Sequence, residues 1–107
     1  MEKRYSQMSD YELQQEIKEL KIKAQRAEQM GMINEVAVLE RKQVMAESYL
    51  LDPNDFKPGE VRYIKEGDGT PFKIDYLDGV FAWGYYGYET EMRAFPIALL
   101  MKDSEAQ

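Results

Sequence analysis

The chain lacks the two side chains that most often carry out catalysis, since its 107 residues include no histidine and no cysteine. Triads and dyads built on histidine or cysteine, disulfides and thiolate metal sites are therefore excluded. Paired carboxylates could still act as acid and base, but no recognised nucleophile–base spacing accompanies them. The sequence predicts no catalytic residue and no enzyme activity.

The densest cluster of side-chain oxygens is the segment Glu66-Gly67-Asp68-Gly69-Thr70. A calcium loop needs more oxygen ligands at a fixed spacing, and the EF-hand pattern is absent. Gly67 and Gly69 also lack the rest of a dinucleotide-binding fingerprint. A polar hairpin loop is the better interpretation, so the sequence predicts no metal site and no cofactor.

Aromatic residues crowd into the segment Trp83–Tyr88. Trp83, with Phe81 and Tyr85, could stack on bases or fill a core, and the strand pairing described below favours the core. Tyr86 and Tyr88 are harder to bury, because a regular strand points them away from Trp83. We expect both to be partly exposed and to belong to a partner-binding surface at the junction of the two parts. The alternative is that the helical hairpin and the barrel bury them against each other within one monomer.

Arg4 and Tyr5 precede the first helix and complete the candidate surface. They could instead anchor the N-terminal segment to the barrel, and the sequence does not separate the two roles.

The charge balance is acidic throughout, with a net charge of −6. Up to Asp52 the chain has 8 basic and 10 acidic residues, and after it 6 and 10. Nucleic-acid binding usually requires a basic face, so this charge disfavours it. No apolar run is long enough to span a membrane, and no secretory signal is present. We expect a cytoplasmic protein.

Two helices are predicted before Asp52-Pro53. Ser9 and Glu12 form a capping box, and Gly31 ends the first helix. Its apolar seam consists of Leu13, Ile17, Leu20, Ala24 and Ala27. The second helix, capped by Asn34, reaches about Leu51. It has a wide apolar face comprising Ile33, Val36, Ala37, Leu39, Val44, Ala46, Leu50 and Leu51. The short connection makes the pair antiparallel.

In the second part of the chain, apolar and polar residues alternate with the period of two that is typical of β-strands. Strands are predicted at Glu60–Lys65, Phe72–Leu77, Val80–Tyr86 and Tyr88–Phe95, followed by a helical turn at Ile97–Leu100. This pattern predicts an α+β protein in which a helical hairpin, residues 1–52, precedes a small closed β-barrel, residues 53–107.

Asp78-Gly79 is a strong signal for a two-residue hairpin turn. Such a turn pairs Tyr76 with Phe81, Ile74 with Trp83 and Phe72 with Tyr85. This register places all six of those side chains on one face, which we expect to be the core.

Five segments of the sequence resemble the YfhH-like family, small uncharacterised proteins of Bacillus-type bacteria. They are Lys3–Met8, Ile33–Lys42, Tyr49–Leu51, Pro58–Glu60 and Leu77–Gly84. The resemblance covers nearly the whole chain and implies a helical hairpin followed by an SH3-like barrel. Members have been labelled transcriptional regulators, and the family supplies no catalytic or binding residues to carry over.

We therefore expect a non-enzymatic interaction or regulatory module that acts through contacts with a protein partner or with a second copy, as in a homodimer. The candidate partner surface is Arg4, Tyr5, Tyr86 and Tyr88. A nucleic-acid-binding transcriptional regulator is the alternative, which the acidic charge disfavours.

Overall fold

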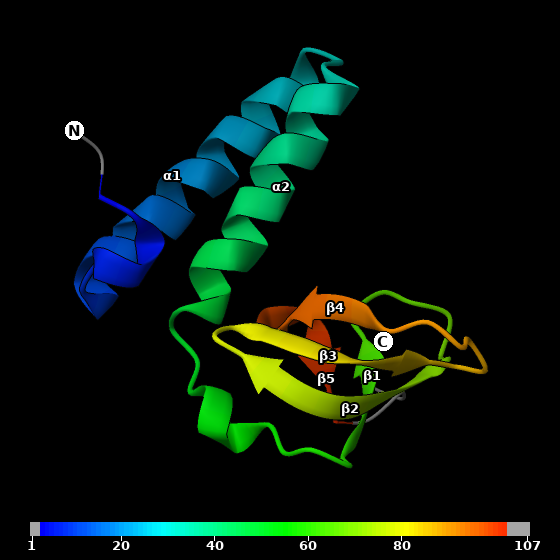
Figure 1. Ribbon diagram of the computed structural model, residues 1–107. Helices are drawn as coiled ribbons and strands as arrows, with labels where there is room; N and C mark the ends of the chain where they lie inside the picture. Colours follow the sequence, from blue (N-terminus) through cyan, green and yellow to red (C-terminus); the bar gives the residue numbers. More distant parts are fainter. Residues whose placement is uncertain (1–2, 103–107) are drawn as a thin grey trace. The chain divides into compact units, whose positions relative to one another are not determined.

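The computed structural model describes residues 3–102 and divides into two compact units, Met1–Leu50 and Leu51–Gln107 (Figure 1). The first unit is helical and the second is built on an antiparallel sheet, so the predicted α+β class is confirmed. Within residues 3–102, no helix combines the length and the apolar character needed to cross a bilayer.

The helical unit consists of a 3₁₀ turn and two α-helices. They are η1 (Tyr5–Gln7), α1 (Asp10–Gln29) and α2 (Ile33–Ser48). The predicted capping box is confirmed, because the Glu12 amide donates to Ser9 Oγ and the Ser9 amide donates to Glu12 Oε1, both at 3.1 Å. Gly31 adopts the left-handed φ of +72°, which ends α1 as expected.

The core of the helical unit follows the predicted seam of α1 more closely than that of α2. Leu13, Leu20 and Ala27 are buried on α1, and Leu39 and Ala46 are buried on α2. Each pair of neighbours in these sets is separated by seven residues, or about two turns, which keeps the buried side chains on one stripe.

The predicted limits and face of the second helix are partly wrong. Met32 occupies the cap position and Asn34 lies inside α2, because the chain re-enters a helix directly after Gly31. Ile33 is 80% exposed rather than part of the apolar face. The helix also ends at Ser48 instead of Leu51, where the Leu50 amide donates to the Glu47 carbonyl and tightens the last turn.

The sheet unit holds five strands in the order β4-β3-β2-β1-β5. They are β1 (Val61–Ile64), β2 (Pro71–Asp78), β3 (Phe81–Tyr86), β4 (Arg93–Pro96) and β5 (Leu100–Met101), with 3₁₀ turns η2 (Pro53–Asp55) and η3 (Ile97–Leu99). All four ladders are antiparallel.

The expected closed, SH3-like barrel is wrong, because the sheet is open. Within the described residues no ladder joins β4 to β5, although the sheet curls so that β1 and β5 lie behind β2 and β3 (Figure 1). Both edge strands are short. β4 ends at Pro96, which has no amide to donate, and β5 has only two residues.

Two other boundaries differ from expectation. The fourth strand begins at Arg93 rather than Tyr88, and the helical turn after Pro96 is a 3₁₀ turn ending at Leu99. The amide of Ile97 donates to the carbonyl of Val80 at 2.9 Å, which fastens this turn to the loop between β2 and β3. Ile97 is fully buried as a result.

The predicted hairpin turn is wrong by one residue, so Tyr76 pairs with Trp83 and not with Phe81, two residues away from the expected partner. Asp78 pairs with Phe81, so the two loop residues are Gly79 and Val80. Gly79 has a φ of +60° and is the only residue of this loop with positive φ. That pattern suits a type II′ turn, which needs glycine only at its first central position, whereas the expected turn requires positive φ at Asp78 as well.

A bulge at Asp75 produces the change of face. The ladder shifts between Ile74 and Tyr76, so Ile74 pairs with Gly84 while Tyr76 pairs with Trp83. The extra residue lets Ile74 and Leu77, three positions apart, both point toward the core. Tyr76 and Trp83 consequently lie on the opposite side from the one expected.

The buried face of β2 and β3 is formed by large side chains on one strand and small ones on the other. Phe72 and Ile74 are 0% and 1% exposed, and Ala82 is also fully buried. At Gly84 an added Cβ would lie 1.9 Å from the Lys73 carbonyl oxygen, so only glycine fits there.

A buried arginine fixes the segment that leads into the sheet. Arg62 of β1 forms an ion pair with Glu60, donates to the Asp55 carbonyl at 3.1 Å and stacks over the Phe56 ring at 4.3 Å. These contacts satisfy its charge within the unit, so Arg62 is a structural residue and does not belong to a surface site.

Candidate functional site

The outer face of the sheet carries two rows of side chains that run across the strands. The first row is Val61, Lys73 and Tyr85, and the second is Tyr76, Trp83 and Ala94. We call these six residues the outer face. They come from β1, β2, β3 and β4, so the strand ladders hold their spacing without any loop.

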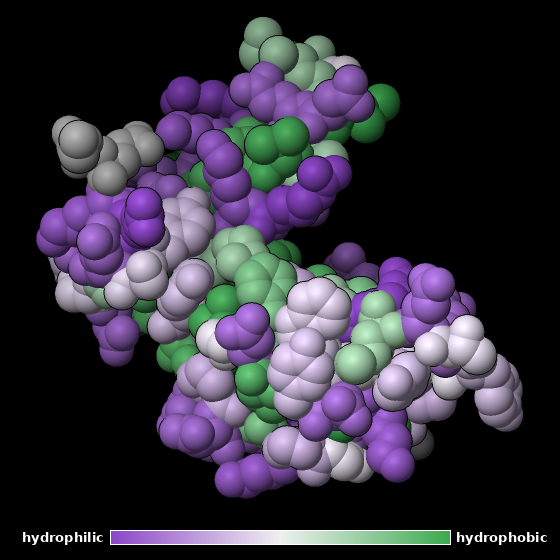
Figure 2. Space-filling model, viewed as in Figure 1, coloured by the Kyte–Doolittle hydropathy of each residue, from purple (hydrophilic) through white to green (hydrophobic). Residues whose placement is uncertain are grey.

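Large apolar side chains remain accessible on the outer face. Val61 and Tyr76 are each 42% exposed, Tyr85 is 38% exposed, and Trp83 is half-buried. The rings of Tyr76 and Trp83 are stacked, with centroids 6.1 Å apart and planes 4° from parallel. Figure 2 shows pale, weakly polar side chains gathered over β2 and β3 on the side turned to the viewer.

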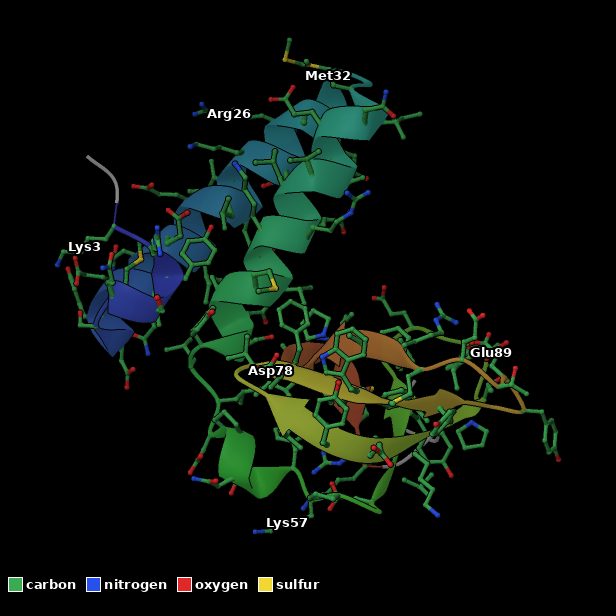
Figure 3. All side chains as sticks on the ribbon, in the orientation of Figure 1. Lys3, Arg26, Met32, Lys57, Asp78 and Glu89 are labelled. Atoms are coloured by element: carbon green, nitrogen blue, oxygen red, sulfur yellow. The ribbon has the colours of Figure 1, made fainter. Side chains whose placement is uncertain are left out.

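The charge on the outer face is small and mixed. Lys73 lies between Val61 and Tyr85 in its row, where its methylene stem extends the apolar surface. Asp75 at the bulge and Asp78 at the end of β2 (labelled in Figure 3) are both exposed nearby. One cation beside two carboxylates gives no basic track for a nucleic-acid backbone.

Tyr86 faces the opposite way from Trp83, as predicted, but it has several partners in the sheet unit. Its hydroxyl donates to Asp68 Oδ1 at 3.0 Å, and the Arg93 guanidinium lies 4.8 Å from its ring centroid. Its ring is also 6.1 Å from that of Phe95. Tyr86 therefore ties the loop before β2 to the end of β3 and is half-buried.

Hydrogen bonding to Thr70 and Tyr86 lowers the pKa of the Asp68 carboxyl. The Thr70 hydroxyl and the Thr70 amide are the main donors, followed by the Tyr86 hydroxyl. All three favour the charged form of Asp68. The oxygen-rich loop thus holds itself together internally, in agreement with a polar hairpin loop. Within residues 3–102, no group of three or more histidine, cysteine or acidic side chains is arranged to hold a metal ion.

Tyr88 is fully exposed in the loop between β3 and β4 and has the most accessible aromatic ring of the sheet unit. Together with Thr70, Pro71, Tyr86 and Gly87 it lines an open hollow of about 610 Å³. Glu89 also lines this hollow, and Figure 3 labels it in the loop.

Arg4 and Tyr5 belong to the helical unit, where they line two adjoining hollows of about 470 and 530 Å³. The Tyr5 hydroxyl donates to Glu16 Oε2 at 2.8 Å, which holds the N-terminal turn against α1. Arg4 is exposed. Tyr5 therefore anchors the N-terminal turn to α1 within its own unit, whereas the anchoring considered from the sequence was to the sheet unit.

The comparisons with known proteins give a family but no activity. The family described as "Protein of unknown function (DUF1811)" matches residues 3–101. The chain belongs to this family. It is similar to the "Uncharacterized protein YfhH" of Bacillus subtilis (strain 168), with 53% identity over 103 residues that cover 95% of this chain and 98% of that protein.

The resemblance noted in the sequence is therefore confirmed at the level of the family. Neither description names a ligand, a reaction or a regulatory role. The label of transcriptional regulator receives no support from them, so a function has to be argued from the surfaces themselves.

The sequence interpretation missed the outer face because it assigned those aromatics to the core. One signal could have corrected it. Small residues in a strand often mark the face on which another element approaches closely. Ala82 and Gly84 are such residues, so their side of β3 could have been recognised as the packed side. Placing Ala82 and Gly84 inside puts Trp83 and Tyr85 outside.

Proposed function

We propose that this chain is a non-enzymatic interaction module whose outer face binds a partner protein. The observation that carries the proposal is the accessibility of Val61, Tyr76 and Tyr85 around the half-buried Trp83 on a single sheet face. Tyrosine and tryptophan are enriched in protein interfaces because they add large contact areas with few rotatable bonds. A rigid sheet keeps them in place before binding, which lowers the entropic cost of association.

The composition supports a role without catalysis. With no histidine and no cysteine, the chain has neither the commonest general base nor a thiolate nucleophile. The absence of cysteine also suits a protein of the reducing cytoplasm, where we place this module.

A protein partner suits the outer face better than a nucleic acid. The face offers one lysine, and the whole chain has a net charge of −6 that would repel a phosphate backbone. A second candidate function is still supported by one observation, the stacked Tyr76–Trp83 pair, because exposed rings can stack on unpaired bases. A nucleic-acid-binding regulator is therefore the alternative to be tested.

The residues predicted from sequence take different parts in this proposal. Tyr88 adds a separate contact point at the loop between β3 and β4, since its ring is fully exposed. Tyr86 is held at the end of β3, beside that loop, by its contacts with Asp68 and Arg93. Arg4 belongs to a separate surface on the helical unit.

The test is a pull-down from the native host with a variant that carries Tyr76→Ser and Tyr85→Ser. We expect the variant to lose partner proteins that the wild type retains. Tyr11→Ser is the matched control, because Tyr11 is 69% exposed on α1 and its removal should leave capture unchanged. Sedimentation of both variants shows whether the partner is a second copy.

Two results would contradict the proposal. Equal capture by wild type and by the outer-face variant would show that the partner binds elsewhere. Tight binding of a single-stranded oligonucleotide at low salt, lost in the Tyr76 and Tyr85 variant, would favour the nucleic-acid alternative.

A further inference from the structure

The helical unit has a groove whose chemistry differs from that of the outer face. Its volume is about 470 Å³, and one wall is the N-terminal turn η1 while the other is the second half of α2. Its lining residues are Arg4, Tyr5, Ser6, Arg41, Lys42, Met45 and Tyr49. We call it the basic groove.

The floor of the basic groove is apolar and held in place. Met45 and Tyr49 are four residues apart on the same side of α2 and its C-cap, and both are half-buried. Tyr5 faces them from η1, with its hydroxyl bonded to Glu16 of α1. Because these three side chains come from packed elements, the floor exists before any ligand binds.

The rim of the basic groove is positively charged. Arg4, Arg41 and Lys42 are exposed, and within residues 3–102 none of them forms an ion pair. Lys3 (labelled in Figure 3) behaves differently, since its ammonium group pairs with Glu12 at 3.1 Å. No carboxylate is found among the described residues that line the groove. Three unpaired cations around an apolar floor are unusual in so acidic a chain.

We propose that the basic groove binds an acidic peptide segment of a partner protein, with an apolar or aromatic side chain on the floor and carboxylates on Arg4, Arg41 and Lys42. Charge complementarity selects this occupant, because arginine forms paired hydrogen bonds with carboxylates. The inference does not depend on the outer face, which belongs to the other unit.

The surroundings favour a short acidic peptide over a nucleic acid. The neighbouring hollow of about 530 Å³ shares Arg4, Tyr5 and Lys42 with the groove, but Glu12 and Glu16 also line it. A nucleic acid presents a phosphate at every step and would have to run past these carboxylates. A peptide can place its charges over the three cations alone.

The experiment is an anisotropy titration of the full chain with a fluorescein-labelled peptide in which glutamate pairs flank a central phenylalanine. We expect saturable binding that weakens as salt is added. Arg41→Glu replaces an attraction with a repulsion of similar size, so it should weaken binding by about tenfold. Circular dichroism confirms that this exposed substitution leaves the helices intact.

The control variant is Lys21→Glu, which makes the same charge change at an exposed position of α1 that does not line the groove. It should bind the peptide within about twofold of wild type, since distant exposed charges are screened by salt. A peptide with glutamine in place of glutamate should bind neither protein.

Several results would overturn the inference. They are a peptide affinity that Arg41→Glu leaves unchanged, an equal loss with Lys21→Glu, or failure of the peptide to bind. Tighter binding of a single-stranded oligonucleotide would assign the groove to nucleic acid. A dimer that Arg41→Glu converts to a monomer, without peptide binding, would assign it to a second copy.

Discussion

The two faces of the β2–β3 hairpin differ in a way that side-chain size alone does not predict. The buried face has Ala82 and Gly84 on β3, while the outer face has the much larger Trp83 and Tyr85. The core can accept the small residues because larger side chains lie opposite them, Leu77 across from Ala82 and Ile74 across from Gly84. The largest aromatics of the chain are thus left at the surface, where they are free to make contacts.

The largest expected effect comes from removing a side chain of the buried face. Phe72→Ala should cost about 3–5 kcal/mol of unfolding free energy, because it leaves a cavity in a fully buried site. Tyr85→Ala, on the outer face, should cost no more than about 1 kcal/mol. Urea denaturation followed by circular dichroism measures both. Similar losses at the two positions would break the distinction between the faces.

A smaller loss is expected from adding a methyl group to the buried face. Gly84→Ala places a Cβ against the Lys73 carbonyl oxygen and the Ile74 Cα, at 1.9 and 3.0 Å before relaxation. The strands must separate or shift register, which we expect to cost about 2–3 kcal/mol. Thermal unfolding of the variant measures the cost. A variant as stable as wild type would show that the two strands do not approach as closely as the bulge at Asp75 implies.

The smallest expected effect concerns Tyr86, which shares the buried face with Phe72 but reaches the loop at Asp68. Hydrogen bonds from Thr70 and Tyr86 lower the pKa of Asp68 below its ordinary value of 3.8. Their stabilisation is fully present above that value and is lost as the pH falls through the lowered pKa of the folded state.

Tyr86→Phe removes one of these donors and should reduce the loss of stability on acidification below pH 3.8. Melting temperatures measured from neutral to acid pH test this, with Tyr88→Phe as the control, because Tyr88 is fully exposed. An acid response that Tyr86→Phe leaves as large as in wild type would show that the Tyr86 hydroxyl does not stabilise the charged form of Asp68.

Much of the fold could be predicted where one local interaction decides the structure. The capping box at Ser9 and Glu12 and the left-handed Gly31 depend on neighbouring residues only, and both were correct. The hairpin was predicted in the right place but in the wrong register. A turn that starts one residue later moves each cross-strand partner by two residues, which changes the pairs but not the face on which a side chain lies.

The candidate surfaces were less predictable, because they depend on the pairing and packing of segments that are far apart in the sequence. The choice of the buried face depended on the bulge at Asp75, which no local pattern marks. The closed barrel required β4 to meet β5, and the two short edge strands do not pair. The basic groove joins η1 to residues more than thirty positions later on α2, so no sequence window contains it.

The central claim is that Trp83 lies on an accessible outer face, and the chain contains no other tryptophan. Acrylamide quenching of its fluorescence therefore reports on this one position, with the urea-unfolded chain as the reference for full exposure. We predict ready quenching of the folded protein, at a lower rate than in the unfolded chain, and a loss of quenching when a partner binds. Emission that is shifted to the blue and shielded from acrylamide in the isolated protein would contradict the account, because it would place Trp83 in the core.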